Sequence, residues 1–293
     1  MIFLAPLAEP VIAAAAAADR MTLCLHQNTS SGAGFRKSLE GWAKAGIKNV
    51  ELNDRLLAEF LKTDSLAAAR RLLGDLGLTP VCGAAVQPDF WNLNPGWAAS
   101  LETWKQKCGQ YATLGLNKVY APSNTSRTIT MEDYTRVPDC IRQAGEAARQ
   151  HNLTALVEFT RSSTLVSTLT TSLRLIREAA HPSVHPMLDL YHFWSGLSKF
   201  EDLDLLRPGE LAHVHFQDVP DMPRELLDSS TRSIPGDGVA PLVRILRKLS
   251  GKGYAGPLSV ELFRPEFQKG DPYEVARRIR EKAEPVMRQA KVM

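Results

Sequence analysis

Short apolar runs alternate along this chain with longer stretches in which apolar residues recur every three or four positions. The short runs have the length of buried strands, and the longer stretches have the period of amphipathic helices. Strands are predicted at residues 21–27, 48–53, 79–85, 117–122, 154–160, 184–190, 211–217 and 256–262. Helices are predicted at residues 35–46, 65–77, 97–115, 131–151, 169–180, 200–206, 241–253 and 271–291.

Residues that commonly start and end helices mark several of these boundaries. Gly46, Gly77 and Gly115 fall where three helices stop, and Thr130 with Asp133 has the spacing of a capping box. Strand–helix alternation predicts a parallel sheet, and eight such units favour a closed (β/α)8 TIM barrel, a single domain of the α/β class. An open doubly wound sheet is the alternative, but no GxGxxG loop follows the first strand.

The first twenty residues differ in composition from the rest of the chain. This Ala-rich extension, residues 1–20, has the small-residue run of a signal-like segment, yet no Lys or Arg precedes the run, and Glu9 and Pro10 interrupt it. We expect the barrel to occupy residues 21–293 and the protein to be cytoplasmic, with export through the N-terminal segment as the alternative. No run reaches the roughly 18–20 apolar residues of a membrane span, so no membrane partner is expected.

The overall composition is that of an ordinary globular protein, because 44% of the 293 residues are hydrophobic and 23% are charged. The net charge of +3 is dispersed over several helices, so a nucleic acid partner is not expected. The four cysteines, at positions 24, 82, 108 and 140, lack CxxC spacing. They predict buried free thiols rather than a disulfide frame or a zinc knuckle.

Polar side chains gather at the carboxyl ends of the predicted strands, where barrel enzymes carry their chemistry. They are His26, Glu51, Glu158, Asp189, His213, His215 and Glu261. The apolar neighbours of Glu158 and Glu261 fall on the opposite strand face, so these carboxylates are expected to point into the barrel. Three carboxylates and a histidine in one cavity repel one another unless a cation lies among them.

The sequence therefore predicts a divalent metal held by Glu158, Asp189, His215 and Glu261. An oxygen-rich set with one nitrogen suits Mn²⁺ or Mg²⁺, with Co²⁺ or Zn²⁺ as alternatives. Other strand-end residues have competing explanations. Glu51 could instead form a salt bridge. His213 is expected to be a hydrogen-bonded histidine inside the barrel rather than a ligand. His26 could be a ligand or such a hydrogen-bonded histidine.

These motifs resemble the xylose isomerase-like TIM barrel superfamily of sugar isomerases and epimerases over about residues 21–290. The residues that carry the resemblance are VEF with Glu158, LDLYH with Asp189 and His192, HVHFQD with His215, PGDG at 235–238, and GYAGPLSVEL with Glu261. The resemblance implies one divalent metal, Mn²⁺ by preference, on the four predicted ligands. It also implies that Glu158 and Glu261 act as an acid–base pair on opposite faces of the sugar, and that His192 contacts the substrate.

Two departures from the family pattern narrow this expectation. Ketose 3-epimerases usually carry an arginine six positions after the strand-seven histidine, but here Asp221 stands there, and Arg224 or Arg232 would have to substitute. The endonuclease IV branch needs further histidines at strand ends three and four and before the PGDG-like turn. This chain has Gly83, Ala84, Pro122 and Arg232 at those places. A nuclease is therefore not favoured, and the low net charge agrees with this.

Loops after two of the strands are rich in aromatic residues, namely Phe90, Trp91, Trp97, Phe193 and Trp194. These rings could stack on a sugar or pack the rim, and we take Trp194 as a substrate contact. The long polar loop that ends at Gly238 could close over the cavity and supplies Arg224 and Arg232. With His26 and Glu51, these arginines complete the expected substrate contacts.

The sequence thus predicts a metal-dependent sugar isomerase or epimerase of carbohydrate metabolism, which abstracts the proton next to a carbonyl by means of Glu158 and Glu261. A dehydratase or lyase on a keto-sugar, similar to inosose dehydratase, shares that first step and is the close alternative. A non-catalytic sugar-binding barrel and a nuclease are distant alternatives. The expected partners are a small-molecule sugar and further copies of the chain, as a homodimer or homotetramer.

Overall fold

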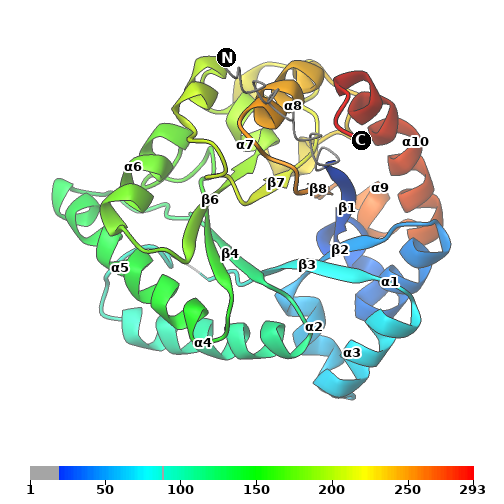
Figure 1. The fold of residues 1–293 in the computed structure, drawn as a ribbon, viewed down its shortest axis with the longest axis horizontal. Helices are drawn as coiled ribbons and strands as arrows, with labels where there is room; N and C mark the ends of the chain where they lie inside the picture. The colour runs from blue at the N-terminus through cyan, green and yellow to red at the C-terminus, as the bar shows by residue number, and fades with distance from the viewer. Residues whose placement is uncertain (1–19, 88) are drawn as a thin grey trace, which may run out of the picture.

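Eight parallel strands close into a barrel in chain order, with the last strand paired to the first (Figure 1). The structure is a computed structural model, and it describes residues 20–87 and 89–293. The strands are β1 (Thr22–His26), β2 (Asn49–Leu52), β3 (Thr79–Ala84), β4 (Lys118–Pro122), β5 (Thr154–Glu158), β6 (Val184–Asp189), β7 (His213–His215) and β8 (Pro257–Val260). Each strand lies inside its predicted range, so the prediction of a single-domain (β/α)8 TIM barrel is confirmed.

Helices surround the barrel on its outer side (Figure 1). They are α1 (Gly34–Lys44), α2 (Asp54–Phe60), α3 (Leu66–Asp75), α4 (Trp97–Thr113), α5 (Met131–Arg149), α6 (Leu169–Ala179), α7 (Leu190–Ser195), α8 (Leu242–Gly251), α9 (Pro265–Gln268) and α10 (Pro272–Ala290). The predicted helix at 200–206 is the 3-10 helix η2 (Phe200–Leu205), and further 3-10 helices are η1 (Gln27–Ala33), η3 (Arg224–Leu226) and η4 (Ser229–Thr231). The short α2, α7 and α9 were not predicted, because so few turns show no periodicity.

The predicted helix boundaries are confirmed at several points. Thr130 and Asp133 form the capping box of α5. Gly46, Gly77 and Gly115 follow α1, α3 and α4 with φ of +83°, +62° and +86°, a conformation that favours glycine after a helix end.

The apolar side chains of the strands form two separate clusters, one on each face of the sheet. The larger cluster lies between sheet and helices and includes Val157 and Val260, as the strand alternation predicted. The smaller cluster is inside the barrel and consists of Cys82, Ala84, Tyr120, Leu156 and Met187. Polar side chains, rather than further apolar ones, fill the carboxyl end of the barrel interior. The four cysteines are buried and free, as predicted.

Two predictions concern parts of the chain beyond the barrel. Residues 1–19 of the predicted extension lie outside the described residues. Within the described part, no helix combines the length and the apolar character that a bilayer crossing requires.

Candidate metal centre

Four predicted side chains meet at the carboxyl end of the barrel. Glu158, Asp189 and His215 end β5, β6 and β7, and Glu261 directly follows β8. One ligand atom from each lies within 4.8 Å of those of the other three. Nδ1 of His215 is 3.2 Å from Oε1 of Glu158 and 3.4 Å from both Asp189 Oδ2 and Glu261 Oε2. The barrel thus brings three carboxylates and an imidazole nitrogen to one point.

The geometry of this cluster fits a divalent metal. Metal–ligand bonds of about 2.0–2.2 Å place adjacent ligand atoms roughly 3.0–3.5 Å apart. The distances from Nδ1 of His215 to the three carboxylates lie in this range. Two of the candidate ligand atoms, Oε1 of Glu158 and Nδ1 of His215, are buried without a hydrogen-bond partner among the described residues. Burial raises the pKa of Glu158 to about 7, and the charges of Asp189 and Glu261 add to the rise. A cation would offset both effects.

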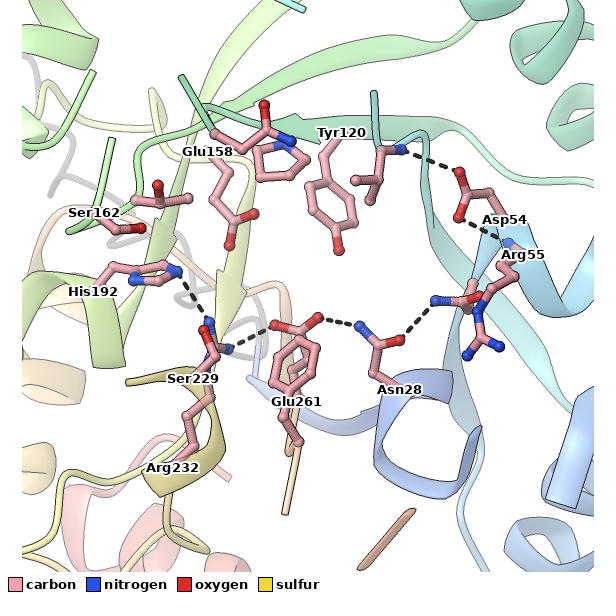
Figure 2. Close-up of a pocket in the computed structure, with 16 residues that line it drawn as sticks. Asn28, Asp54, Arg55, Tyr120, Glu158, Ser162, His192, Ser229, Arg232 and Glu261 are labelled. Carbon is pink, nitrogen blue, oxygen red and sulfur yellow. Dashed lines mark hydrogen bonds and ion pairs between the residues drawn. The ribbon is translucent and has the colours of Figure 1, made fainter. Parts of the chain in front are cut away.

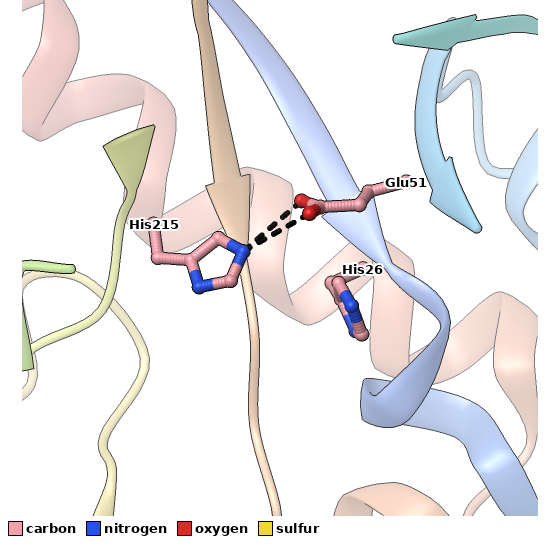
Figure 3. Close-up of side chains that lie close together, drawn as sticks. All are labelled: His26, Glu51 and His215. Atoms are coloured by element: carbon pink, nitrogen blue, oxygen red, sulfur yellow. Dashed lines mark hydrogen bonds and ion pairs between the residues drawn. The ribbon is translucent and has the colours of Figure 1, made fainter. Parts of the chain in front are cut away.

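Glu51 lies beneath the cluster and holds His215 from the other side (Figure 3). It is fully buried, and its carboxylate accepts hydrogen bonds from Nε2 of His215 at 3.1 Å and Nε2 of His213 at 2.9 Å. Burial alone would raise the pKa of Glu51, but the two imidazoles hold it well below its usual range. A carboxylate on the far nitrogen of a metal-binding histidine is a common supporting arrangement. The position of Glu51 is therefore not that of the substrate contact predicted for it.

His26 also lies outside the cavity and is fully buried. Its Nδ1 accepts a hydrogen bond from the Asn28 backbone at 3.0 Å, and its Nε2 is 3.1 Å from the Tyr120 hydroxyl. Burial lowers the pKa of His26, so the ring is neutral. Because a neutral imidazole has one N–H, Nε2 donates to Tyr120. His26 therefore orients cavity residues rather than facing a substrate as predicted.

Arg232 is the buried cation of the site, with 2% of its surface exposed. Its Nη1 donates to Asp189 Oδ2 at 2.9 Å. The same Nη1 donates to Glu261 Oε2 at 2.6 Å, and Nη2 donates to Nε2 of His192 at 3.0 Å (Figure 2). Burial lowers the pKa of His192 to about 4, so this ring is neutral and accepts the bond. Three carboxylates and one guanidinium leave two negative charges, which a divalent ion balances.

Asp218 anchors the loop that carries Arg232. Its carboxylate accepts hydrogen bonds from the backbone N–H groups of Gly236 at 3.0 Å, Gly238 at 3.1 Å and Ala240 at 2.9 Å. A Cβ at Gly238 would lie 2.3 Å from the Val219 carbonyl oxygen, so the close approach requires glycine. Together with the antiparallel bridge between Asp218 and Ser233, this clamp places Arg232 at the cluster.

A cavity of about 560 Å³ opens beside the cluster (Figure 2). Glu158, His192, Arg232 and Glu261 line one side, and Asn28, Asn53, Asp54, Arg55, Tyr120 and Phe263 are among the other lining residues. Asn28 donates to Glu261 Oε1 at 2.7 Å and accepts from Nδ2 of Asn53 at 2.7 Å. We did not predict Asn28, Asn53 or Tyr120, because these neutral residues at strand ends carry no charge that draws attention in a sequence.

Two other predicted contacts lie away from this cavity. Arg224 donates to the Gly196 carbonyl at 2.7 Å, and Trp194 packs beside Tyr191, Val219 and Leu227. Neither lines the cavity.

The loop aromatics decide between two predicted alternatives. Phe90, Trp91, Trp97 and Phe193 have exposed fractions between 0% and 7% and belong to the main core. Phe90 stacks on Trp104 of α4 with ring centroids 4.9 Å apart. Of the two alternatives for these four rings, the structure supports packing over stacking on a sugar, because their side chains are buried in the main core.

Comparison with known proteins extends these observations. A family model described as xylose isomerase-like TIM barrel matches residues 39–289. An inosose isomerase of Halalkalibacterium halodurans is 26% identical over 254 residues, which cover 84% of this chain and 89% of that protein. A 3-dehydroshikimate dehydratase of Pseudomonas putida is 27% identical over 237 residues, 79% of this chain but 36% of that protein. A crystal structure of IOLI protein with a bound zinc atom superposes with a TM-score of 0.86 at 24% identity, covering 93% of this chain and 99% of the other.

Proposed function

The chain belongs to the xylose isomerase-like TIM barrel family, and we propose that it uses a divalent metal to remove the proton next to the carbonyl of a keto-sugar or cyclic keto-polyol. Its relatives are named as isomerases and dehydratases, so the chain is an enzyme with isomerase-, epimerase- or dehydratase-like activity on keto-sugars. One observation carries the proposal. Oε1 of Glu158 and Nδ1 of His215 are buried ligand atoms without a hydrogen-bond partner among the described residues. They belong to a cluster that borders the cavity.

The proposed ligands are Glu158, Asp189, His215 and Glu261, and the proposed ion is Mn²⁺, with Mg²⁺, Co²⁺ or Zn²⁺ as alternatives. Three oxygens and one nitrogen form a harder set than the cysteine-containing sites that select zinc. When bound, such an ion polarises the carbonyl and stabilises the negative charge that develops on its oxygen.

The protein's own residues then divide the remaining work. Glu158 takes the proton on its second carboxylate oxygen, because the side chain lines the cavity while its buried Oε1 faces the metal cluster. Glu261 is held from two sides by Asn28 and Arg232, so its carboxylate has a fixed orientation toward the bound ring. In the proposed acid–base pair, Glu261 returns a proton that it has first taken up from solvent, and Glu158 afterwards releases its own proton to solvent. His192 and Arg232 line the cavity beside the reacting carbon, and Arg232 holds His192 in place as the proposed contact for a substrate hydroxyl.

Return of the proton to the former carbonyl carbon isomerises the substrate, provided that the proton of the adjacent hydroxyl moves to the former carbonyl oxygen. Return to the opposite face of the carbon that lost the proton epimerises it. Expulsion of a hydroxyl one carbon further on gives dehydration from the same first step. The similarity to the Pseudomonas putida dehydratase makes dehydration the second candidate. Product mass distinguishes them, because only dehydration loses one molecule of water.

Hydrogen exchange in deuterated water tests the proposal. Metal-loaded protein is incubated with a panel of ketoses and cyclic keto-polyols, and we expect deuterium at the carbon next to the carbonyl. Glu158→Gln should reduce exchange by at least about 100-fold, as loss of a general base does. Asp189→Asn should lose the bound ion, and Glu132→Gln, a change at a 73% exposed side chain on α5, is the matched control.

Absence of exchange with every ketone would refute the proposed reaction and favour a sugar-binding barrel. Three metal equivalents per chain would instead indicate a nuclease.

A further inference from the structure

Two arginines line the cavity, and they differ in their partners. The guanidinium of Arg232 is committed to Asp189, Glu261 and His192. Arg55 is exposed, in the first turn of α2, and only its backbone N–H is hydrogen-bonded; within residues 20–87 and 89–293 its guanidinium has no hydrogen bond or ion pair. Arg55 thus presents to the cavity a guanidinium that no described side chain binds.

The neighbouring Asp54 keeps its negative charge but does not bind the Arg55 guanidinium. Its Oδ1 accepts a hydrogen bond from the Arg55 backbone at 2.8 Å, and its Oδ2 accepts one from the Val86 backbone at 3.1 Å. Both oxygens are therefore turned onto the main chain. A cation in the first turn of a helix also lies at the positive end of the helix dipole, so the helix gains nothing from an arginine at this place.

Arg55 lies across the cavity from Glu158 and His192 (Figure 2). Asn53 caps α2 by accepting the Leu56 N–H at 2.9 Å, and its amide connects through Asn28 to Glu261. Two amide side chains therefore separate the start of α2 from the metal cluster, and fix it there. A ring with its carbonyl at the cluster has its far side toward Arg55.

The charges around the cavity narrow the chemistry of that far side. With the proposed divalent ion, Glu158, Asp189, Glu261 and Arg232 sum to no net charge. Asp54 and Glu51 add negative charge, but both are hydrogen-bonded to other groups, so Arg55 is the cavity-lining cation whose guanidinium is free to bind an anion directly. One guanidinium matches one carboxylate through two parallel hydrogen bonds. A phosphate dianion would need further positive charge, and no glycine-rich phosphate-binding loop follows the strands.

We propose that Arg55 is a specificity residue that binds the carboxylate of a non-phosphorylated cyclic keto-polyol acid, while the carbonyl of the same ring lies at the metal cluster. This inference rests on the proposed function.

A pair of ring ketones tests it: 3-dehydroshikimate, which carries a carboxylate, and inosose, which is neutral. Arg55→Gln should raise KM for the carboxylated ketone about 10- to 100-fold and leave kcat within about threefold, because a charge-assisted bond to the ground state is lost. Constants for the neutral ketone should not change. Arg55→Lys should restore part of the loss, and Arg71→Gln, at an exposed position of α3, is the charge-matched control.

Salt gives an independent readout, since added NaCl should raise KM for the carboxylated ketone in the wild type but not in Arg55→Gln. The inference would be overturned if Arg55→Gln changed KM equally for both ketones or for neither. It would also be overturned if the wild type turned over the neutral ketone alone. The proposed function would stand in each of these cases. If neither ketone reacts, equilibrium binding of shikimate to the metal-loaded proteins decides. Weaker binding to Arg55→Gln supports the inference, and equal binding overturns it, whatever the exchange experiment says of the proposed function.

Discussion

Glu51→Gln tests the carboxylate that the structure places under the metal centre. Glu51 accepts hydrogen bonds from the Nε2 atoms of His213 and His215 and is fully buried. Glutamine has the same size, but its NH2 group cannot accept a hydrogen bond. One imidazole N–H then faces a donor, so His215 loses the contact that keeps its Nδ1 free to bind a metal.

The expected effect is a 10- to 100-fold weaker metal affinity, the usual cost of losing a partner behind a metal ligand, or about 1.4–2.7 kcal/mol. We expect the upper part of this range, because Glu51 is shared by two imidazoles and is fully buried. Competition with a fluorescent chelator for Mn²⁺ measures the affinity. Asp189→Asn serves as the reference for a lost ligand, and Glu132→Gln as the surface control.

An unchanged Mn²⁺ affinity combined with a raised KM would contradict this reasoning. Glu51 would then be the substrate contact that its position in the sequence suggested. Melting curves of the metal-free proteins separate a loss of affinity from a general loss of stability.

Three further changes test the fold and the metal. Asp133→Asn should destabilise the protein by about 1 kcal/mol through the α5 cap. The Arg127 hydrogen bond lowers the pKa of Asp133 to about 2. Urea titrations should therefore show the stability difference between wild type and variant above about pH 4, and its loss as the pH falls toward 2. Gly83→Ala should lower the free energy of unfolding by about 1–3 kcal/mol, since the new Cβ would lie 2.6 Å from the Tyr111 ring. In Gly74→Ala on α3 the new Cβ meets nothing within 4 Å, so this variant should be neutral or stabilising. Equal effects of the two changes would contradict the packing argument. EDTA should lower the melting temperature of the wild type but not of Asp189→Asn, and a fall of equal size in both would mean that these residues hold no metal.

Much of the fold follows from local patterns. Strand alternation and helical period depend on residues a few positions apart, so all eight strands and the cap at Thr130 could be predicted from the sequence. The short helices α2 and α7 could not, because each begins at a side-chain cap, Asn53 and Asp189, rather than from a repeated pattern.

The meeting of Glu158, Asp189, His215 and Glu261 could also be anticipated, because the carboxyl ends of all strands share one end of a barrel. Their partners could not. Glu51 and His215 are 164 positions apart and Asn28 and Glu261 are 233 apart, so their contacts exist only after the barrel closes.

The sequence by itself determined the architecture and the end of the barrel where the polar residues gather, since both follow from period and strand direction. Only the tertiary structure decided which polar residues face the cavity and which support others from behind. Arg232 reaches the cluster because the Asp218 clamp folds its loop inward, and Phe90 is buried because its loop turns back onto α4. Loop paths depend on packing between segments distant in sequence, and no local pattern encodes that packing.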